Sequence, residues 1–204
     1  MKRSALPLVL ASTSPRRRQV LEQIGLRFEI VPPPGDVERG WDGAEPPDAF
    51  ARSVAEAKAR AVARERPHAV VLAADTIVVL DGEVLGKPAG VVEAARMLGR
   101  LSGREHVVHT GITVIAPGGV LAGGVESTAV GIRPLTGAEI DAYVATGEPL
   151  DKAGAYGIQG LGAALVEEVR GCYFNVMGLP VARLLAVLRE LGFDYFWPGS
   201  IVRR

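Results

Sequence analysis

Residues 6–18 read LPLVLASTSPRRR, an apolar run that passes directly into hydroxyl side chains, a proline and three arginines. The apolar run predicts a buried strand over Leu6–Ala11. Ser14 is a favourable helix N-cap, and Pro15 suits the first helical position because its missing N–H would have no partner there. The stretch therefore predicts a strand, a tight turn and a helix over Pro15–Gly25 that ends at its glycine.

The arginines of this stretch, Arg16, Arg17 and Arg18, crowd the first turn of the predicted helix. A helix N-terminus already carries partial positive charge, so cations there reduce stability unless an anion binds. Backbone N–H groups, hydroxyls and guanidinium groups that converge at a helix start suit a phosphate chain. A solvent-exposed basic turn is the alternative, and it accounts for one arginine better than for three.

The rest of the chain alternates between strand and helix patterns at first, and hairpins dominate its middle. This order predicts an α/β or α+β domain with a mixed sheet. In the longest predicted helix, Pro47–Arg66, the spacing of Phe50, Val54, Ala57 and Ala61 predicts the buried stripe.

Turn and capping residues punctuate the other predicted elements. Asp81-Gly82 and Pro117-Gly118-Gly119 each indicate a hairpin turn. Thr136 and Glu139 form the pattern of a capping box, and the last residues, which carry Trp197 and a basic end, are expected to fray. Further strands are predicted at Arg27–Val31, Ala69–Leu80, Glu105–Ile115, Val120–Ile132 and Ala163–Val169, and further helices at Val91–Leu101, Thr136–Ala145 and Val176–Leu191.

Composition narrows the class of protein. The 204 residues include 23 basic and 23 acidic side chains, and a formal net charge of zero argues against general binding to nucleic acid or acidic membranes. The one cysteine, Cys172, cannot form an internal disulfide and fits a reducing compartment. Lys2 and Arg3 precede only a short apolar run, so we expect a soluble, cytoplasmic protein. Trp41 and Trp197, which we expect to be exposed, are candidates for a homodimer interface.

Asp75 is the residue whose position points most strongly to chemistry. With Thr76 it interrupts an otherwise apolar stretch, between Val70–Ala74 and Ile77–Leu80. A carboxylate within a buried strand is unfavourable unless a cation, a metal or hydrogen bonds compensate for its lost hydration. Asp75 could then bind a divalent metal or act as a general base toward water, and Thr76 could donate a hydroxyl to a ligand. The plainer alternative places Asp75 at a strand end, where it would cap a turn.

Two lysines are candidate phosphate ligands. Lys87 lies between Gly86, which allows close backbone approach, and Pro88, which stiffens the chain. It would act as a directed point charge, although an ordinary surface lysine is an equally simple interpretation. Lys58 lies at the edge of the predicted apolar stripe, where it could either aim at a pocket or extend along the surface.

Two loops carry polar residues of interest. The proline-rich loop Pro32–Pro47 contains Asp36 and Glu38, which are either solvated acids or groups that serve a site as metal ligands. The glycine-rich segment Gly154–Gly160 contains Gln159, whose planar amide suits the edge of a nucleotide base. This segment matches neither a Walker A motif nor a dinucleotide fingerprint, and an irregular connection is its plain alternative.

The histidines and the cysteine argue against other chemistries. His106 and His109 lie three positions apart in a predicted strand and therefore face opposite sides of it, which argues against a zinc site. Cys172 has only Arg170 nearby to activate it, and no serine occupies a nucleophile elbow.

Five blocks of sequence, taken together, resemble the Maf family of nucleoside triphosphate pyrophosphatases, also called septum-formation inhibitors. The resemblance runs from about Leu8 to Leu191 in the order of the family, and Gly178-Leu179-Pro180 fits it as well. The five blocks are Ala11–Arg17, Ala55–Ala59, Ala74–Val78, Gly86–Pro88 and Asp151–Gly160.

The resemblance implies an α/β fold of the inosine-triphosphatase type, in which a mixed, elongated sheet is flanked by helices. It implies a single domain over residues 1–204, with a cleft between two lobes. It also implies magnesium- or manganese-dependent hydrolysis of a nucleoside triphosphate to the monophosphate and pyrophosphate. The late loop, Tyr156-Gly157-Ile158-Gln159, resembles the branch that acts on dTTP and UTP, with CTP and modified pyrimidine nucleotides as further candidates. A pyrophosphatase for non-standard purine triphosphates and a non-enzymatic, nucleotide-binding regulator of septum formation are the alternatives.

The resemblance further assigns roles to individual residues. Asp75 matches the proton acceptor of the family. Between Asp36 and Glu38, Glu38 is favoured as the acid that would hold the metal together with Asp75. Positions linked to substrate choice are matched by Arg16, Thr76 and Gln159, and phosphate-side groups by Ser12, Arg17, Lys58 and Lys87.

Overall fold

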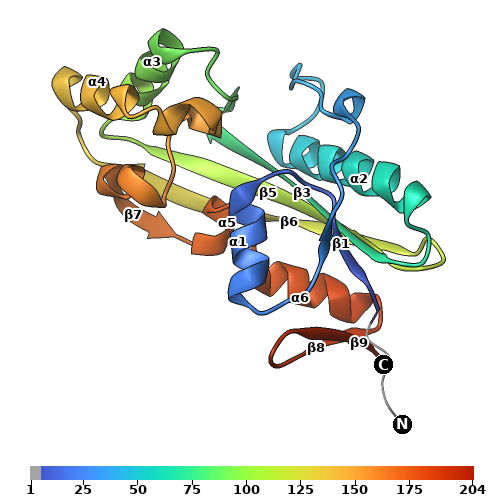
Figure 1. Ribbon diagram of the computed structural model, residues 1–204. Coiled ribbons are helices and arrows are strands. Elements are labelled where there is room, and N and C mark those ends of the chain that lie inside the picture. Colours follow the sequence, from blue (N-terminus) through green and yellow to red (C-terminus); the bar gives the residue numbers. More distant parts are fainter. Residues whose placement is uncertain (1–5) are drawn as a thin grey trace.

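The computed structural model describes residues 6–204, so Lys2 and Arg3 lie outside the described residues. A seven-stranded sheet forms its centre, in the order β2-β1-β3-β5-β6-β7 with β4 attached to β3 (Figure 1). The strands of this sheet are β1 Leu8–Leu10, β2 Glu29–Ile30, β3 Val70–Leu80, β4 Glu83–Leu85, β5 Glu105–Ile115, β6 Leu121–Ile132 and β7 Val166–Arg170. A separate hairpin near the C-terminus consists of β8 Phe193–Phe196 and β9 Ser200–Arg203.

The sheet is mixed, as predicted. β1 runs parallel to β2 and β3, whereas β3, β5, β6 and β7 are successively antiparallel. β3 continues without a break through Asp75 and Thr76, which pair with Gly111 and Thr110 of β5. The two polar residues therefore lie in the middle of a strand, and the alternative that placed Asp75 at a strand end is wrong.

One edge of β3 is only partly covered. β1 pairs with Val70–Leu72, and β4 pairs with Val78–Leu80. Between them, residues 73–77 have β5 on one side and, within the described part of the chain, no strand on the other. Because β1 ends at this point and leads into a helix, Asp75 and Thr76 are left beside the start of that helix.

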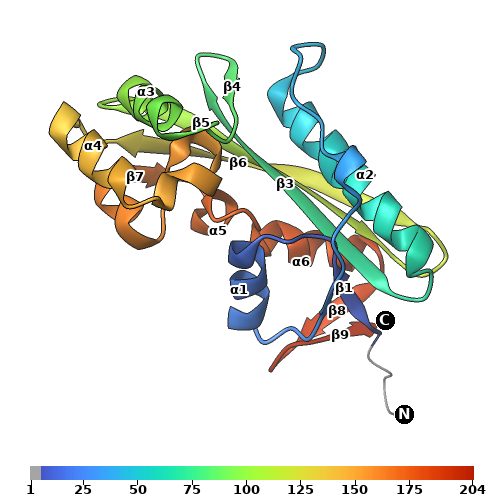
Figure 2. The ribbon, with the colours of Figure 1, turned by 45° about the horizontal axis from the view of Figure 1, so that its top comes forward.

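Helices cover both faces of the sheet (Figure 2). Successive residues of β3 face opposite sides, and Val71 packs against α2 whereas Leu72 packs against α1 and α6. Val78 lies on the same face as Leu72 and packs against α3 and α4. The helices are α1 Pro15–Gln23, α2 Pro47–Glu65, α3 Val91–Leu101, α4 Gly137–Ala145, α5 Tyr173–Val176 and α6 Val181–Glu190, with short 3₁₀ turns η1 Gly35–Val37, η2 Glu148–Asp151, η3 Ala153–Ala155 and η4 Gly160–Leu165.

Local turn and capping signals are confirmed. The chain reverses at Asp81-Gly82 between β3 and β4, and at residues 117–119 between β5 and β6. At the start of α4, the Thr136 side chain accepts from the backbone of Glu139, and the Glu139 side chain accepts from the backbone of Thr136. These signals are reliable because each depends on residues within a few positions of one another.

The buried face of α2 differs from the prediction. Ala57 and Ala61 are partly exposed, and Lys58 lies in the buried stripe instead. The helix approaches β5 so closely that a Cβ added at Gly111 would lie 2.4 Å from the carbonyl oxygen of Ala51. The size of the residues at this contact, rather than their hydropathy alone, sets which face of α2 meets the sheet.

The predictions for the C-terminal region are wrong in two respects. The helix expected over Val176–Leu191 begins only at Val181, as α6, because Pro180 has no N–H to continue a helix and precedes its first residue instead; Val176 is the last residue of the short helix α5. The residues expected to fray form the β8–β9 hairpin. Phe193 and Ile201 of this hairpin are buried in the main core, so apolar burial orders this segment.

The same hairpin contacts the C-terminal end of α1. The Tyr195 hydroxyl donates to the carbonyl oxygen of Ile24 at 2.6 Å. Gly199 lies so close to Gly25 that a Cβ added at Gly199 would be 2.0 Å from the Gly25 carbonyl oxygen. Gly25 has a φ of +73°, the left-handed conformation expected of a glycine that ends a helix.

Two predicted strands are shorter than expected. The strand over Arg27–Val31 reduces to β2, both residues of which are exposed. The strand over Ala163–Val169 begins only at Val166, because the preceding glycine-rich residues form the 3₁₀ turn η4. Both shortened strands lie at the ends of the sheet, where few cross-strand neighbours extend the pairing.

The two tryptophans differ in exposure. Trp41 is partly buried against the cluster of Phe50 and Val54, and its Nε1 donates to the Glu45 carbonyl oxygen at 2.9 Å. Trp197 is 82% exposed. Trp41 therefore has a packing role within the chain, contrary to the expectation of an exposed residue. Within residues 6–204, none of the helices combines the length and apolar character needed to cross a membrane.

Candidate active site

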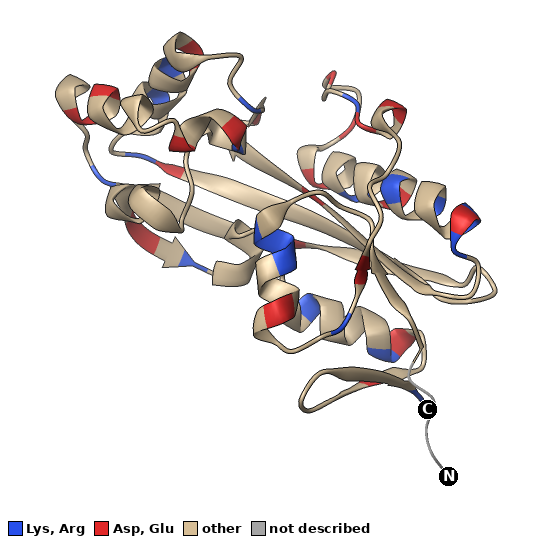
Figure 3. Ribbon diagram, in the orientation of Figure 1, with Lys and Arg blue, Asp and Glu red and all other residues tan. Residues whose placement is uncertain are grey.

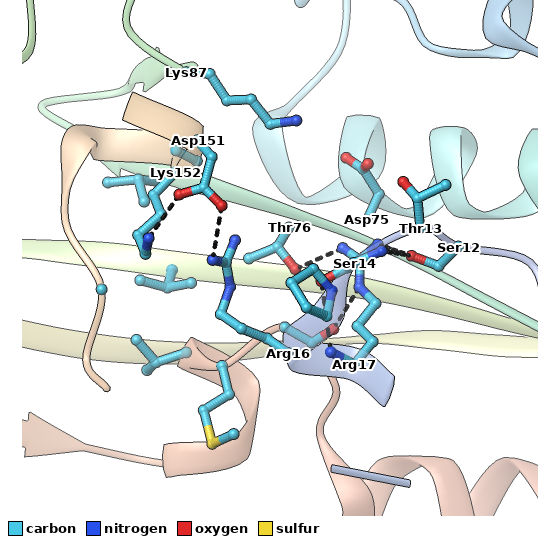
Figure 4. Close-up of a pocket in the computed structure, with 18 of the residues that line it drawn as sticks. Ser12, Thr13, Ser14, Arg16, Arg17, Asp75, Thr76, Lys87, Asp151 and Lys152 are labelled. Atoms are coloured by element: carbon cyan, nitrogen blue, oxygen red, sulfur yellow. Dashed lines mark hydrogen bonds and ion pairs between the residues drawn. The ribbon is translucent and has the colours of Figure 1, made fainter. Parts of the chain in front are cut away.

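A pocket of about 380 Å³ opens at the uncovered edge of β3 (Figure 4). The start of α1, the middle of α2, the loop after β2 and the segment around η2 and η3 surround it. The structure brings all of the predicted site residues to this one pocket: Ser12, Arg16, Arg17, Glu38, Lys58, Asp75, Thr76, Lys87 and Gln159.

The start of α1 forms one wall of the pocket. The Ser14 hydroxyl caps the helix by accepting from the backbone N–H of Arg17, and the Ser12 hydroxyl accepts from the backbone N–H of Ser14. Figure 3 shows the basic residues gathered at this helix start. Arg18 points elsewhere and pairs with Glu22, so the predicted cluster of three arginines contributes two to the pocket.

Arg17 is held by hydrogen bonds on three sides. Its Nε donates to the Gly178 carbonyl oxygen at 2.9 Å, its Nη1 to Ser12 Oγ at 3.0 Å and its Nη2 to Thr76 Oγ1 at 3.2 Å. Burial lowers the pKa of the Arg17 guanidinium, and the nearby negative charge of Asp75 opposes that shift. A guanidinium has five N–H groups, so the side chain keeps two donors for a ligand.

Lys58 joins the two acids of the pocket. Its Nζ lies 2.8 Å from Asp75 Oδ1 and 2.8 Å from Glu38 Oε1, although the side chain is only 6% exposed. The hydrogen bond from Lys58 lowers the pKa of Glu38, which keeps this carboxylate charged at neutral pH. Asp36 is exposed in η1 and does not line the pocket. Of the two loop acids, Glu38 is thus the one that lies close to Asp75.

Further cationic side chains line the pocket. Arg16 Nη1 lies 3.4 Å from Asp151 Oδ2, and Lys152 Nζ lies 2.6 Å from Asp151 Oδ1. Lys87, after β4, extends its side chain toward the pocket (Figure 4). Asp151 thereby pairs with one cation on α1 and with one on its own segment.

Glu148, to which sequence reasoning assigned no role, orders the loop that carries Gln159. Its carboxylate accepts from the Tyr143 hydroxyl and from the backbone N–H groups of Leu161 and Gly162, each at 2.9 Å. Burial acts to raise the pKa of Glu148, but these hydrogen bonds outweigh it and lower the pKa. No local pattern could have identified this residue, because it lies 13 and 14 positions from the N–H groups that it binds.

His106, which the sequence suggested only as an unsuitable zinc ligand, supports Tyr156 of the pocket. Its Nε2 lies 2.7 Å from the Tyr156 hydroxyl, and the two rings meet edge to face. Burial lowers the pKa of His106 to about 4, so the ring is neutral at neutral pH. Its Nδ1 is buried and has no hydrogen-bond partner among residues 6–204.

Residues 6–204 contain no group of three or more histidine, cysteine, aspartate or glutamate side chains that could hold a metal ion. Glu38 and Asp75 meet only through Lys58. Magnesium ions are commonly held by one or two carboxylates and completed by substrate phosphates and water. The donor set of this pocket fits an ion of that kind, and it does not fit a preformed site made of protein ligands alone.

A family model described as Maf-like protein matches residues 7–191. The chain belongs to the Maf family. A dTTP/UTP pyrophosphatase of Symbiobacterium thermophilum is 48% identical over 193 residues, covering 95% of this Maf chain and 98% of the relative. Proteins of the same name are 53% identical in Moorella thermoacetica and 54% identical in Anaeromyxobacter dehalogenans, and each alignment covers 96% of the relative and more than nine tenths of this chain.

Among solved structures, a nucleoside-triphosphatase described as a dITP/XTP pyrophosphatase from Mycobacterium abscessus aligns with a TM-score of 0.43. The two chains are 16% identical, and the alignment covers 90% of this Maf chain and 94% of the other. A likeness at this level carries no argument about activity. The β8–β9 hairpin lies beyond the residues that the family model matches.

Proposed function

We propose that this Maf protein hydrolyses dTTP and UTP to the nucleoside monophosphate and pyrophosphate. The observation that carries the proposal is a single pocket in which two arginines at a helix start lie near two carboxylates bridged by a buried lysine. A triphosphate requires cations for its oxygens and a base for the attacking water, and this pocket offers both. The names of the relatives supply the choice of nucleotides.

The phosphate chain lies against the start of α1 in this proposal. Arg17 donates its two remaining N–H groups, and Arg16 and Lys87 add positive charge from either side. Ser12 acts mainly by holding Arg17, because its oxygen already accepts from that side chain. Prepositioned charges of this kind stabilise the transition state without reorganising during the reaction.

Asp75 orients a water molecule and takes its proton as the water oxygen attacks the α-phosphorus. The bond between the α-phosphorus and the oxygen that bridges it to the β-phosphorus breaks, and pyrophosphate leaves with that oxygen. Asp75 then passes the proton to solvent. Lys58 holds the Asp75 carboxylate in place throughout, through their 2.8 Å contact.

Glu38 and Asp75 are the residues that would hold a magnesium or manganese ion. When bound, such an ion supplies positive charge to the phosphate oxygens. Lys58 Nζ, 2.8 Å from each carboxylate, offsets one of their two negative charges and leaves one for such an ion to balance.

Gln159 reads the edge of the pyrimidine base. Its amide carries both donors and an acceptor, so it can match a base edge that presents both kinds of group. Tyr156 and Ile158 line the same side of the pocket and provide apolar surface for the ring.

A nucleotide panel tests the proposal. UTP, dTTP, CTP, GTP and a non-standard purine triphosphate are each incubated with the enzyme, with magnesium or with a chelator, and the products are identified by chromatography. We expect UTP and dTTP to yield monophosphate and pyrophosphate only with metal, and phosphate release to depend on added inorganic pyrophosphatase. A preference for the non-standard purine would favour the purine alternative, and binding without turnover of any nucleotide would favour a regulator.

A further inference from the structure

We propose that Thr110 and Asn175 are positioning residues that act on Arg17 through a one-directional chain of hydrogen bonds. The proposal rests on the proposed role of Arg17 as a phosphate ligand. The chain passes from Arg17 on α1 to Thr76 on β3, then to Thr110 on β5, and ends at the backbone carbonyl of Asn175 on α5. Figure 4 shows its first link, between Arg17 and Thr76. Neither Thr110 nor Asn175 lines the pocket itself.

The links of this chain are short and shielded from water. Arg17 Nη2 lies 3.2 Å from Thr76 Oγ1, which lies 3.0 Å from Thr110 Oγ1, and this oxygen lies 2.9 Å from the Asn175 carbonyl oxygen. Thr110 and Asn175 are both 0% exposed. Because water does not reach the far end of the chain, a hydroxyl removed there would not be replaced by solvent.

The two ends of the chain fix the direction of every hydrogen within it. A carbonyl oxygen can only accept, so the Thr110 hydroxyl donates to Asn175. Each hydroxyl has a single hydrogen, so Thr110 must accept from Thr76 at their 3.0 Å contact. Thr76 in turn accepts from Arg17, whose guanidinium can only donate. In this arrangement Thr76 has no hydroxyl hydrogen left for a nucleotide, in contrast to the donor role expected from the sequence.

Asn175 reaches Arg17 by a second route. Its carbonyl oxygen also accepts from the backbone N–H of Gly178 at 2.9 Å, and the Gly178 carbonyl accepts from Arg17 Nε. The Asn175 side chain holds this backbone carbonyl in place, because its Nδ2 donates to the Val108 carbonyl and to Thr128 Oγ1, each at 2.9 Å. Two of the three protein contacts of the guanidinium therefore depend on one buried asparagine.

A fixed guanidinium loses less rotamer freedom when a phosphate binds than a free one does. The chain is therefore expected to affect the binding of the triphosphate more than the chemical step. Loss of this chain of hydrogen bonds should raise KM and leave kcat little changed, because Arg17 contacts the phosphate both in the bound substrate and while the phosphoanhydride bond breaks.

Steady-state kinetics with UTP in three variants test whether KM rises while kcat stays unchanged. Thr110→Val removes the hydroxyl at constant shape, and we expect about a tenfold rise in KM with kcat within about twofold. Thr110→Ser keeps a hydroxyl and should restore KM. Thr113→Val is the matched control, because Thr113 is on the same strand and is 1% exposed but takes no part in this chain of hydrogen bonds. Equal effects of Thr110→Val and Thr113→Val would overturn the proposal.

A second measurement does not depend on turnover. The resonance of the Arg17 Nη2–H that donates to Thr76, assigned by its loss in Arg17→Lys, should exchange slowly with water in the wild type and in Thr113→Val. It should exchange faster in Thr110→Val. If this response occurs in a protein that hydrolyses no nucleotide, the proposed function fails while the positioning chain stands.

Thr76→Val breaks the same chain at its other hydroxyl and serves if Thr110→Val does not fold. It should speed the exchange of the Arg17 Nη2–H resonance, and the double variant with Thr110→Val should show no additional effect, because both changes interrupt one path. Unchanged exchange in Thr76→Val, or additive effects in the double variant, would show that Arg17 is held independently of the chain.

Discussion

The side of the pocket proposed to take the phosphate chain, the phosphate side, and the side proposed to take the base, the base side, are held in different ways. On the phosphate side, Arg17, Lys58 and Asp75 belong to α1, α2 and β3, and each contacts a side chain of another element. On the base side, Gln159 lies among 3₁₀ turns and glycines that depend on the carboxylate of Glu148. The groups proposed to act on the phosphate chain are thus fixed by regular elements around the sheet, whereas the residue proposed to read the base lies on a loop that Glu148 anchors.

The largest effect is expected on the phosphate side, from Asp75→Asn. The amide cannot accept the proton of the attacking water, so kcat should fall about 10²- to 10⁴-fold, or about 3 to 5 kcal/mol. The ratio of kcat/KM for UTP to that for GTP should change little, because the base side is untouched. Steady-state kinetics at saturating magnesium measure both quantities, and turnover at the wild-type rate would remove Asp75 from this role.

Acid should lower the free energy of unfolding through His106, which supports Tyr156 on the base side. Its pKa of about 4 in the folded protein lies below the ordinary value of 6.5, so the unfolded state binds the proton more readily. Its contribution to stability is present above about pH 6.5 and is lost as the pH falls toward about 4, to a total of about 3 kcal/mol.

Denaturant unfolding at several pH values measures this loss. The comparison is with His106→Gln, which does not titrate and should show a flatter dependence between pH 6.5 and pH 4. Parallel curves for the two proteins would contradict the assignment.

Glu148→Gln should disturb nucleotide choice more than the chemical step. An amide has one acceptor oxygen where the carboxylate has two, so at least one of the N–H groups of Leu161 and Gly162 loses its partner, at about 2 kcal/mol. We expect the preference for UTP over GTP to fall about tenfold. The measurement is the ratio of kcat/KM values, and Glu167→Gln, at an exposed residue of β7, is the matched control. A tenfold loss of kcat with preference intact would mean that Glu148 serves the chemistry instead.

The smallest effect is expected from Gln159→Ala. Loss of one hydrogen-bonding amide should reduce the preference for UTP and dTTP over GTP by about fivefold, or about 1 kcal/mol. Competition between UTP and GTP in one reaction measures this ratio directly. An unchanged ratio would show that another group reads the base.

Features encoded by neighbouring residues could be predicted from the sequence. The strand, turn and helix around Ser14 and Pro15, the hairpin turns and the capping box of Thr136 depend on short spacings, and the structure contains each of them. Asp75 could be singled out as well, because a carboxylate in an apolar strand requires compensation wherever it lies.

Contacts between distant parts of the chain could not be predicted in the same way. Lys58 was expected at the edge of an apolar stripe, and only the close packing of α2 on Gly111 turns it toward Asp75 and Glu38. The C-terminal hairpin was missed because its order comes from burial against the core. The resemblance to the Maf family added Ser12 and grouped the other candidates into one site, since spacing alone would not have grouped them.

The contact between the C-terminal hairpin and α1 has a practical consequence for work with this protein. A polypeptide trimmed to residues 7–191, the range that defines family membership, would retain every pocket residue. It would nevertheless lose the partner of Ile24 and Gly25, at the opposite end of the helix that carries Arg16 and Arg17. Truncation at the C-terminus would therefore remove contacts of the helix that carries the proposed phosphate ligands, so residues 192–204 should be kept in kinetic work.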